Sequence, residues 1–153
     1  MRIKGALLSL LMLSFTSVAD NHDERDQIER AVLDYIESQH KVMPELMARG
    51  VDEALAKRTY WKTKDGSEIV LESTYQDMLK LAGSYNKAGD KFPDSPRADI
   101  EIYDIDKRVA SVKLHADDWI DYMHLYKNDQ GQWKVINVLW QFNETQSHSS
   151  ASQ

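Results

Sequence analysis

The chain has 153 residues and a formal net charge of −6, from 25 acidic and 19 basic residues. A net acidic chain without a cluster of Lys and Arg is a poor candidate for binding nucleic acid or an anionic membrane surface. It contains no Cys, which excludes disulfides and lipid attachment through cysteine. Its length suits one domain with its own hydrophobic core.

The first 19 residues have the pattern of a secretory signal peptide. Arg2 and Lys4 form a basic start, an apolar run covers 6–15, and the small residues at 17–19 suit a signal peptidase. The apolar run is shorter than the about 20 residues that span a bilayer. We expect cleavage after residue 19 and a periplasmic protein without a membrane segment. An ordinary N-terminal helix is the alternative.

The first half of the mature chain has helical patterns. Apolar residues recur at spacings of three and four over 23–40, which is typical of an amphipathic helix. Pro44 interrupts that pattern, and a short second helix is predicted over 45–50, with 51–56 adding another turn or two. A third helix, capped by Ser or Thr at its start, is predicted over 74–85.

Runs typical of β-strands dominate the rest of the chain. An Asp-Gly pair at 65–66 predicts a small hairpin, and a loop rich in Gly and Pro is predicted over 86–97. Helices first and an antiparallel meander last indicate an α+β fold. The strands predicted in this way cover 59–61, 69–71, 98–105, 108–116, 119–127 and 132–140.

These elements predict a single domain at 20–143, after the signal peptide at 1–19. The remaining residues, 144–153, are polar and lack large apolar side chains, which predicts a disordered tail. We expect His148 in this tail to be solvated rather than to act as a ligand.

The long hairpin of 119–127 and 132–140 is the most informative segment for function. Neither strand alternates cleanly between apolar and polar residues, so we expect the core to cover one face and a partner or ligand to cover the other. Asp121 lies in the middle of the aromatic and aliphatic run 119–123. A carboxylate in such surroundings has to be paired, protonated or functional.

Three segments of the chain resemble a known family. They are 56–58 (Ala-Lys-Arg), 118–125 (Asp-Trp-Ile-Asp-Tyr-Met-His-Leu) and 133–140 (Trp-Lys-Val-Ile-Asn-Val-Leu-Trp). They are similar to the lumazine-binding-like family of the nuclear transport factor 2-like (SnoaL-like) superfamily, and the resemblance covers about residues 28–140. It implies a cone, in which a strongly curved antiparallel sheet wraps the N-terminal helix and leaves a pocket open at one end.

The ketosteroid isomerases of this superfamily offer a more distant resemblance. Their strand motifs are similar to Ile-Asp-Tyr-Met at 120–123 and to Leu-Trp at 139–140. In them the Asp, which Asp121 matches, donates a hydrogen bond to a developing oxyanion, and a Tyr of the first helix, which Tyr35 matches, lies beside it. Their general-base Asp is expected near 59–61, where this chain has Thr-Tyr-Trp, so the isomerase proton acceptor is missing.

The register of the long hairpin decides which residues share a face with Asp121. A four-residue loop at 128–131 pairs Asp121 with Val138, whereas a three-residue loop with Gly131 as a bulge turns the side chains of the second strand over. We choose the four-residue loop, because the resemblance implies that Asp121 and Trp140 share one pocket. The opposite, outer face is then formed by Ile120, Tyr122, His124, Tyr126, Trp133, Val135, Asn137 and Leu139.

The pocket implied by the resemblance has aromatic walls and two polar anchors. Asp121 and Tyr35 are the anchors and the candidates for catalysis; the alternatives are a structural acid and a core Tyr with its hydroxyl at the pocket rim. The predicted ligand-binding residues are Tyr35, Trp61, Trp119, Asp121, Met123, Ile136, Val138 and Trp140.

These residues favour an exported protein that binds a flat, apolar or heteroaromatic small molecule. One alternative is an isomerase, dehydratase or cyclase that uses Asp121 as its acid, and another is a dimeric protein-interaction module. The outer face of the hairpin is too aromatic for plain solvent, so we expect a homodimer that covers it.

Other side chains carry weaker signals. His124 has no other histidine at a ligand spacing, so we expect no metal site and favour an interface role. The Lys57-Arg58 pair either binds an anion at the pocket mouth or is a solvated basic pair. The sequence has no glycine-rich phosphate loop and no Gly-x-Ser-x-Gly motif, and no cofactor is expected.

Overall fold

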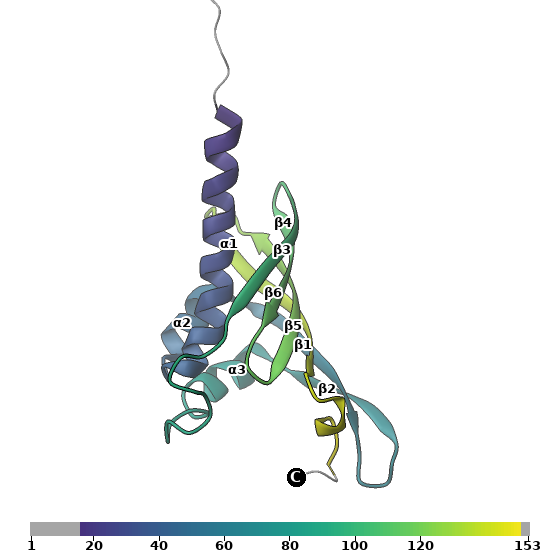
Figure 1. Cartoon of the computed structure of the whole chain (residues 1–153). Coiled ribbons are helices and arrows are strands. Elements are labelled where there is room, and N and C mark those ends of the chain that lie inside the picture. The colour runs from purple at the N-terminus through teal and green to yellow at the C-terminus, as the bar shows by residue number, and fades with distance from the viewer. Residues whose placement is uncertain (1–15, 151–153) are drawn as a thin grey trace, which may run out of the picture.

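The computed structural model describes residues 16–150, and their side chains from Asp23 onward. Three α-helices, one six-stranded sheet and a short 3-10 helix make up this part of the chain (Figure 1). In chain order the elements are α1 (Thr16–His40), α2 (Pro44–Gly50), β1 (Val51–Lys62), β2 (Glu68–Ser73), α3 (Tyr75–Ala82), β3 (Asp99–Asp106), β4 (Val109–His115), β5 (Trp119–Lys127), β6 (Trp133–Phe142) and η1 (Thr145–Ser147).

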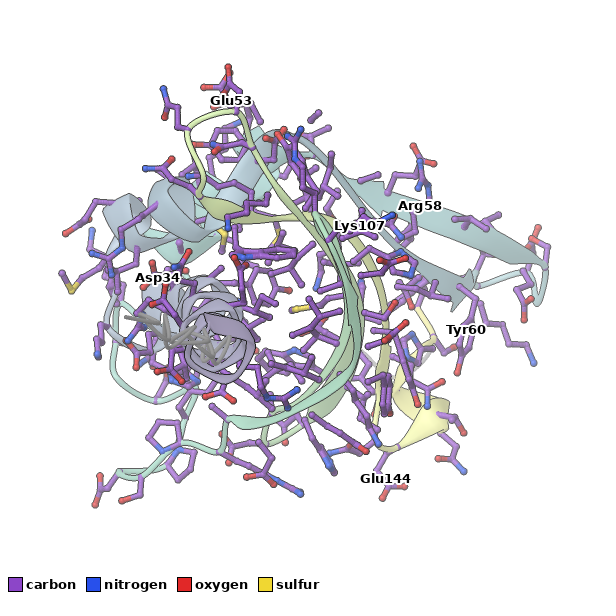
Figure 2. All side chains as sticks on the ribbon, turned by 90° about the horizontal axis from the view of Figure 1, so that it is seen from above. Asp34, Glu53, Arg58, Tyr60, Lys107 and Glu144 are labelled. Atoms are coloured by element: carbon purple, nitrogen blue, oxygen red, sulfur yellow. The ribbon has the colours of Figure 1, made fainter. Side chains whose placement is uncertain are left out.

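The strands lie in the order β2-β1-β6-β5-β4-β3. Neighbouring strands are antiparallel except β1 and β6, which are parallel. The sheet is curved, and Figure 2 shows it as an arc around α1, with side chains filling the space between them. This curved sheet with α1 on its inner side confirms the predicted α+β fold, and the parallel pair of β1 and β6 is the difference from the predicted antiparallel sheet.

The core lies between α1 and the concave face of the sheet. The face of α1 that carries Ile28, Val32 and Ile36 is buried there, as the three-and-four spacing predicts. In β4 every second side chain points inward, so that Ala110, Val112 and Leu114 are buried while their neighbours are not. Burying a side chain the size of Val112 or Leu114 stabilises the fold by roughly 1.5–3 kcal/mol.

Several local predictions are confirmed. Thr74 caps α3 in a capping box with Asp77, and the Asp-Gly turn between β1 and β2 places Gly66 at a positive φ of 87°. The prediction of further helical turns over 51–56 is wrong, because β1 begins at Val51. That residue is buried and pairs with Val135 of β6, so the sheet overrides the local pattern.

The end of α2 is fixed by a close approach to α1. A Cβ on Gly50 would lie 2.5 Å from the carbonyl oxygen of Ala31 and 2.7 Å from Cβ of Asp34, so only glycine fits. Arg49 donates two hydrogen bonds to the buried Asp34, at 2.5 and 2.6 Å. This bidentate pair holds the two helices together on the side of α1 away from the sheet (Figure 2).

The predicted four-residue loop of the long hairpin is wrong. Asn128 N donates to the carbonyl oxygen of Gln132 at 2.8 Å, and Gly131 has a φ of 77°, which makes a three-residue loop with a glycine bulge. Next to the loop, each side chain of β6 therefore points to the face of the sheet opposite to the predicted one. As a result Trp133 and Val135, which the four-residue loop places on the outer face, are buried in the core.

A second irregularity in the same hairpin restores the predicted facing further along. The register shifts between His124 and Leu125, where Ile136 has no partner on β5. Beyond this bulge Val138 and Trp140 face the helix again, and Asp121 pairs directly with Trp140 instead of with Val138. The two one-residue shifts in the pairing of β5 and β6 thus compensate each other, and the inner face near Asp121 is the one that was predicted.

The segment after β6 is folded, which corrects the prediction of a disordered tail from residue 144. It forms η1, and Ser149 then bridges to Lys62 beyond the point where β1 and β6 diverge. His148 is buried rather than solvated, with 1% of its surface exposed. The segment is polar in composition, but one of its side chains, His148, is buried and holds the segment in place. Residues 151–153 lie outside the described residues.

The predicted signal peptide falls mostly outside the described residues, since α1 begins at Thr16. From residue 16 to residue 150, no helix combines the length and apolar character that a membrane crossing requires.

Candidate ligand pocket

A pocket of about 230 Å³ lies between the C-terminal half of α1, the end of α3 and the strands β1, β5 and β6. Its buried members form the inner end, and its half-buried members form the outer end. The inner residues are Gln39, Lys57 and Trp119, and the outer residues are Leu81, Tyr85, Trp140 and Phe142. Most of the lining is apolar; Gln39 contributes an amide, Tyr85 a hydroxyl and Lys57 an ammonium group.

That ammonium belongs to Lys57, and it is held by two buried oxygen groups. Nζ of Lys57 donates to the hydroxyl oxygen of Tyr35 at 2.6 Å and to Oδ1 of Asp121 at 3.0 Å. The Tyr35 hydroxyl in turn lies 3.4 Å from the same carboxylate oxygen. Lys57 is 7% exposed, and Tyr35 and Asp121 are fully buried. The carboxylate of Asp121, which lies in an apolar run of the sequence, is therefore paired with the ammonium group of Lys57.

The second carboxylate oxygen has its own donor. Nε1 of Trp119 donates to Oδ2 of Asp121 at 2.8 Å, two residues along the same strand. Both oxygens are thus bonded, as a buried carboxylate requires. Asp121 also fixes the orientation of the Trp119 indole, which forms one wall of the pocket.

Burial and charge act in opposite directions on Lys57. Burial lowers the pKa of its ammonium group, and the adjacent Asp121 carboxylate opposes this shift. Nζ also lies 4.9 Å from the centroid of a Trp140 ring, a cation–π contact. For Tyr35 both effects agree, because burial raises the pKa of the hydroxyl well above its usual value and the Asp121 charge raises it further.

The outer end of the pocket is aromatic. Phe92, from the loop between α3 and β3, is not among the lining residues but packs against two of them, with its ring centroid 5.7 Å from that of Tyr85 and 5.9 Å from that of Trp119. On the other side Trp140 meets Phe142 edge to face at 5.0 Å. The lining rings of Tyr85, Trp119, Trp140 and Phe142 give the pocket mainly aromatic walls.

Four of the eight predicted ligand-binding residues meet in this site. These are Tyr35, Trp119, Asp121 and Trp140. Nζ of Lys57 contacts Tyr35, Asp121 and Trp140. Trp119 joins the group through its hydrogen bond to Asp121.

The other four predicted residues lie elsewhere. Trp61 faces the same side of β1, but its Nε1 donates to Ser150 and its ring lies against His148, so the C-terminal segment covers it. Met123 and Val138 pair with each other in the core. Ile136, at the bulge, lines a separate hollow with His124 and Tyr126 on the outer face.

Lys57 is a pocket residue that the sequence analysis considered only as part of a pair with Arg58. The adjacent Arg58 suggested a basic pair at the pocket mouth, but the two side chains point to opposite faces of β1. Arg58 pairs with Glu72 of β2 at 2.7 Å and lies outside the arc of the sheet (Figure 2). Alternation along β1, with Leu55, Lys57 and Thr59 all buried, is the signal that identifies Lys57 as an inward-facing residue.

No group of three or more His, Asp or Glu side chains suited to a metal ion occurs among residues 16–150.

Comparisons with known proteins bear on the fold. No protein-family model and no curated protein sequence matches the chain. A protein of unknown function from Silicibacter pomeroyi, described as nuclear transport factor 2-like, superposes with a TM-score of 0.61 at 9% identity, over 80% of this chain and 98% of that one. The chain has the nuclear transport factor 2-like fold.

A second solved structure agrees. A ketosteroid isomerase-like protein from Erwinia carotovora atroseptica superposes with a TM-score of 0.51 at 12% identity, over 80% of this chain and 98% of that one. At such identities the likeness is one of fold. The closer resemblance to the lumazine-binding-like family stays a prediction.

Proposed function

We propose that the protein binds a small, flat, apolar or heteroaromatic molecule, with an oxygen or anionic group of the ligand placed at Lys57. The observation that carries this proposal is the contrast inside the pocket, where one buried ammonium group lies among aromatic walls. Apolar pockets with a few fixed polar groups are typical of small-molecule sites. Lys57, rather than Asp121, is the charged group that lines the pocket.

The size of the pocket limits the ligand. A volume of about 230 Å³ is smaller than the roughly 300–1,000 Å³ of pockets for drug-sized ligands. This favours a compact molecule with one or two rings. Stacking against Trp119 or Trp140 would fix the orientation of the ligand's ring and place the ligand's polar substituent next to Nζ of Lys57.

A matched pair of probes tests the proposal. Naphthoate and naphthamide share one ring system and differ in charge, and both are compared by thermal shift and by quenching of tryptophan fluorescence. A ligand that binds the folded state raises the melting temperature by mass action. We expect naphthoate to give the larger shift and Lys57→Met to remove the difference, whereas Arg58→Met leaves it unchanged. Absence of a shift with any flat probe would contradict the proposal.

Export is part of the same proposal. The basic start, apolar run and small residues of 1–19 support a signal peptide and a periplasmic location. Mass spectrometry of the periplasmic fraction is expected to find a mature N-terminus at Asp20. An intact Met1 on protein recovered from the cytoplasm would contradict it.

An enzyme is the second candidate. The hydroxyl of Tyr35 lies beside the carboxylate of Asp121, as the isomerase resemblance implies, and this favours an isomerase, dehydratase or cyclase that uses Asp121 as its acid. The ketosteroid isomerases have their general-base Asp near the positions 59–61, where this chain has no acid. The basic side chain that lines the pocket from β1 is Lys57. Turnover that survives Asp121→Asn would exclude this candidate.

A homodimer through the outer face of the sheet completes the proposal. Tyr122 and Leu139 pair across β5 and β6 and are 47% and 57% exposed. Two copies related by a two-fold axis would cover this patch. Such a dimer also suits the third candidate, a protein-interaction module.

A further inference from the structure

Lys57 differs from the other lysines of the described chain. Those lysines are exposed or half-buried, whereas Lys57 is buried and lines an apolar pocket. An ammonium group has three donors. Two of them are used by Tyr35 and Asp121, at 2.6 and 3.0 Å, and a ring of Trp140, which also lines the pocket, has its centroid 4.9 Å from the same nitrogen. Because Lys57 is one of the residues that line the pocket, a molecule bound there lies next to its side chain.

We propose that Lys57 captures a flat aromatic aldehyde or ketone by forming an imine with it in this pocket. The inference rests on the proposed function, because the carbonyl compound has to enter the same pocket as the proposed ligand. It adds a covalent step to binding and names the ligand class as carbonyl compounds.

The step balances with the groups that are present. The Lys57 ammonium gives one proton to the Asp121 carboxylate, 3.0 Å away, and becomes a neutral amine. The amine nitrogen adds to the carbonyl carbon, and the carbonyl oxygen takes one proton from the attacking nitrogen and one from the protonated Asp121 carboxyl, which returns to the carboxylate. One molecule of water leaves as the C=N bond forms. No oxidant, reductant or further reactant is needed.

The surroundings favour each stage. Burial lowers the pKa of the Lys57 ammonium, which eases its deprotonation. The Tyr35 hydroxyl lies within hydrogen-bonding distance of both Nζ and the carboxylate, so it can pass a proton between them. A protonated imine keeps the positive charge of the lysine, so its pairing with Asp121 and its contact with Trp140 persist in the product.

The test traps the imine in the wild-type protein. The folded protein is incubated with naphthaldehyde and cyanoborohydride, and the reduced adduct is located by intact mass and peptide mapping. We expect a single early adduct at Lys57, formed at least tenfold faster than at any surface lysine. Naphthylmethanol, which has the same ring but cannot form an imine, is expected to slow this adduct by competition.

Two variants sharpen the comparison. Lys57→Arg keeps the positive charge but cannot form the imine, so the early adduct should vanish, whereas Lys62→Arg on the same strand should leave it unchanged. Because the adduct is mapped on the wild-type protein, the result does not depend on whether Lys57→Arg folds.

The possible failures are distinguishable. If naphthylmethanol or naphthoate stabilises the protein while the aldehyde labels surface lysines and spares Lys57, the imine is ruled out and the binding pocket stands. If no naphthyl probe stabilises the protein and no lysine is labelled preferentially, both proposals fail.

Discussion

Nζ of Lys57 lies 3.0 Å from Oδ1 of Asp121, and this contact joins β1 to β5 across the intervening strand β6. The pairing of the strands explains it. Lys57 is aligned with Val138, and Asp121 with Trp140 two residues further along, so both polar groups meet over the inner face of β6. The same contact holds three strands together and places an amine in the pocket.

The first prediction concerns the stability of this ion pair. Removing one partner leaves a buried charge without compensation, which costs about 3–5 kcal/mol. We expect Lys57→Met and Asp121→Asn each to lower the free energy of unfolding by several kcal/mol. The double variant should lose clearly less than the sum of the two, since it leaves neither charge uncompensated. Urea denaturation of the four proteins measures this coupling, and additive losses would contradict it.

The second prediction concerns the hydroxyl of Tyr35. Burial and the Asp121 charge raise its pKa well above 10, so the folded state holds this proton more tightly than the unfolded state does. The resulting stabilisation is present below about pH 10 and is lost as pH rises further. Wild-type protein should therefore lose stability relative to Tyr35→Phe as the pH rises above about 10. At neutral pH Tyr35→Phe should cost about 1–3 kcal/mol, because Nζ of Lys57 loses an acceptor.

Absorbance at high pH provides an independent measurement of the same hydroxyl. Exposed tyrosines ionise first, and the Tyr35 signal should appear only as the protein unfolds. Equal alkaline titration curves for the wild type and Tyr35→Phe would count against the buried hydrogen bond. Tyr122→Phe is the matched control, since that side chain is half exposed on the outer face.

Periodicity was sufficient to predict most of the elements, because each helix and strand has one buried face. The register of the hairpin was not predictable in this way. Its loop depends on the left-handed conformation of Gly131, and its second bulge at Ile136 leaves no local sequence signal. The inner face at Asp121 was nevertheless correct, because two one-residue shifts restore the alternation.

The predicted site was incomplete for a different reason. Asp121 and Tyr35 are conspicuous because polar groups are rare in such apolar runs, but the partner of Asp121 comes from a strand 64 residues earlier in the chain. Lys57 is next to Arg58, and a pair of basic residues is ordinarily solvated. The tail was misjudged because composition averages over residues, whereas a single buried His148 fixes the segment.

The third prediction concerns His148 and pH. Phe142 N donates to Nε2 of His148 at 2.6 Å, so Nε2 carries no proton, and Nδ1 lies 3.4 Å from the hydroxyl of Thr59. Burial lowers the pKa of this imidazole, so the unfolded state binds a proton more readily than the folded state. The stabilisation is present above about pH 6.5 and is lost as pH falls through the folded-state pKa.

Acidification should therefore release the C-terminal segment. In wild-type protein, hydrogen exchange at Phe142 and Ser150 should speed up as the pH is lowered from about 6.5 through the folded-state pKa. His148→Gln keeps an acceptor that does not titrate, so its exchange should not change over this interval beyond the intrinsic effect of pH. The same acceleration in both proteins would show that another group is responsible.

The fourth prediction concerns assembly through the outer face of the sheet. Tyr126 is not the residue to change, because its hydroxyl donates to Asp52 at 2.6 Å and the side chain is half-buried. Leu139 is the better probe, since it is 57% exposed next to Tyr122 and forms no polar contact to lose. Leaving such a patch in water forgoes roughly 25 cal/mol for each Å² of apolar surface that a partner would cover.

Leu139→Glu would place like charges near the two-fold axis and desolvate them, so we expect monomers of unchanged unfolding free energy per subunit at high dilution. Val70→Glu is the matched control, because Val70 is also exposed but lies on the edge strand β2, away from Leu139 in the sheet order. Sedimentation equilibrium should find dimers for the wild type and Val70→Glu and monomers for Leu139→Glu. A wild-type protein that stays monomeric at tens of micromolar would exclude the dimer, and the exposed pair of Tyr122 and Leu139 would then need a different partner.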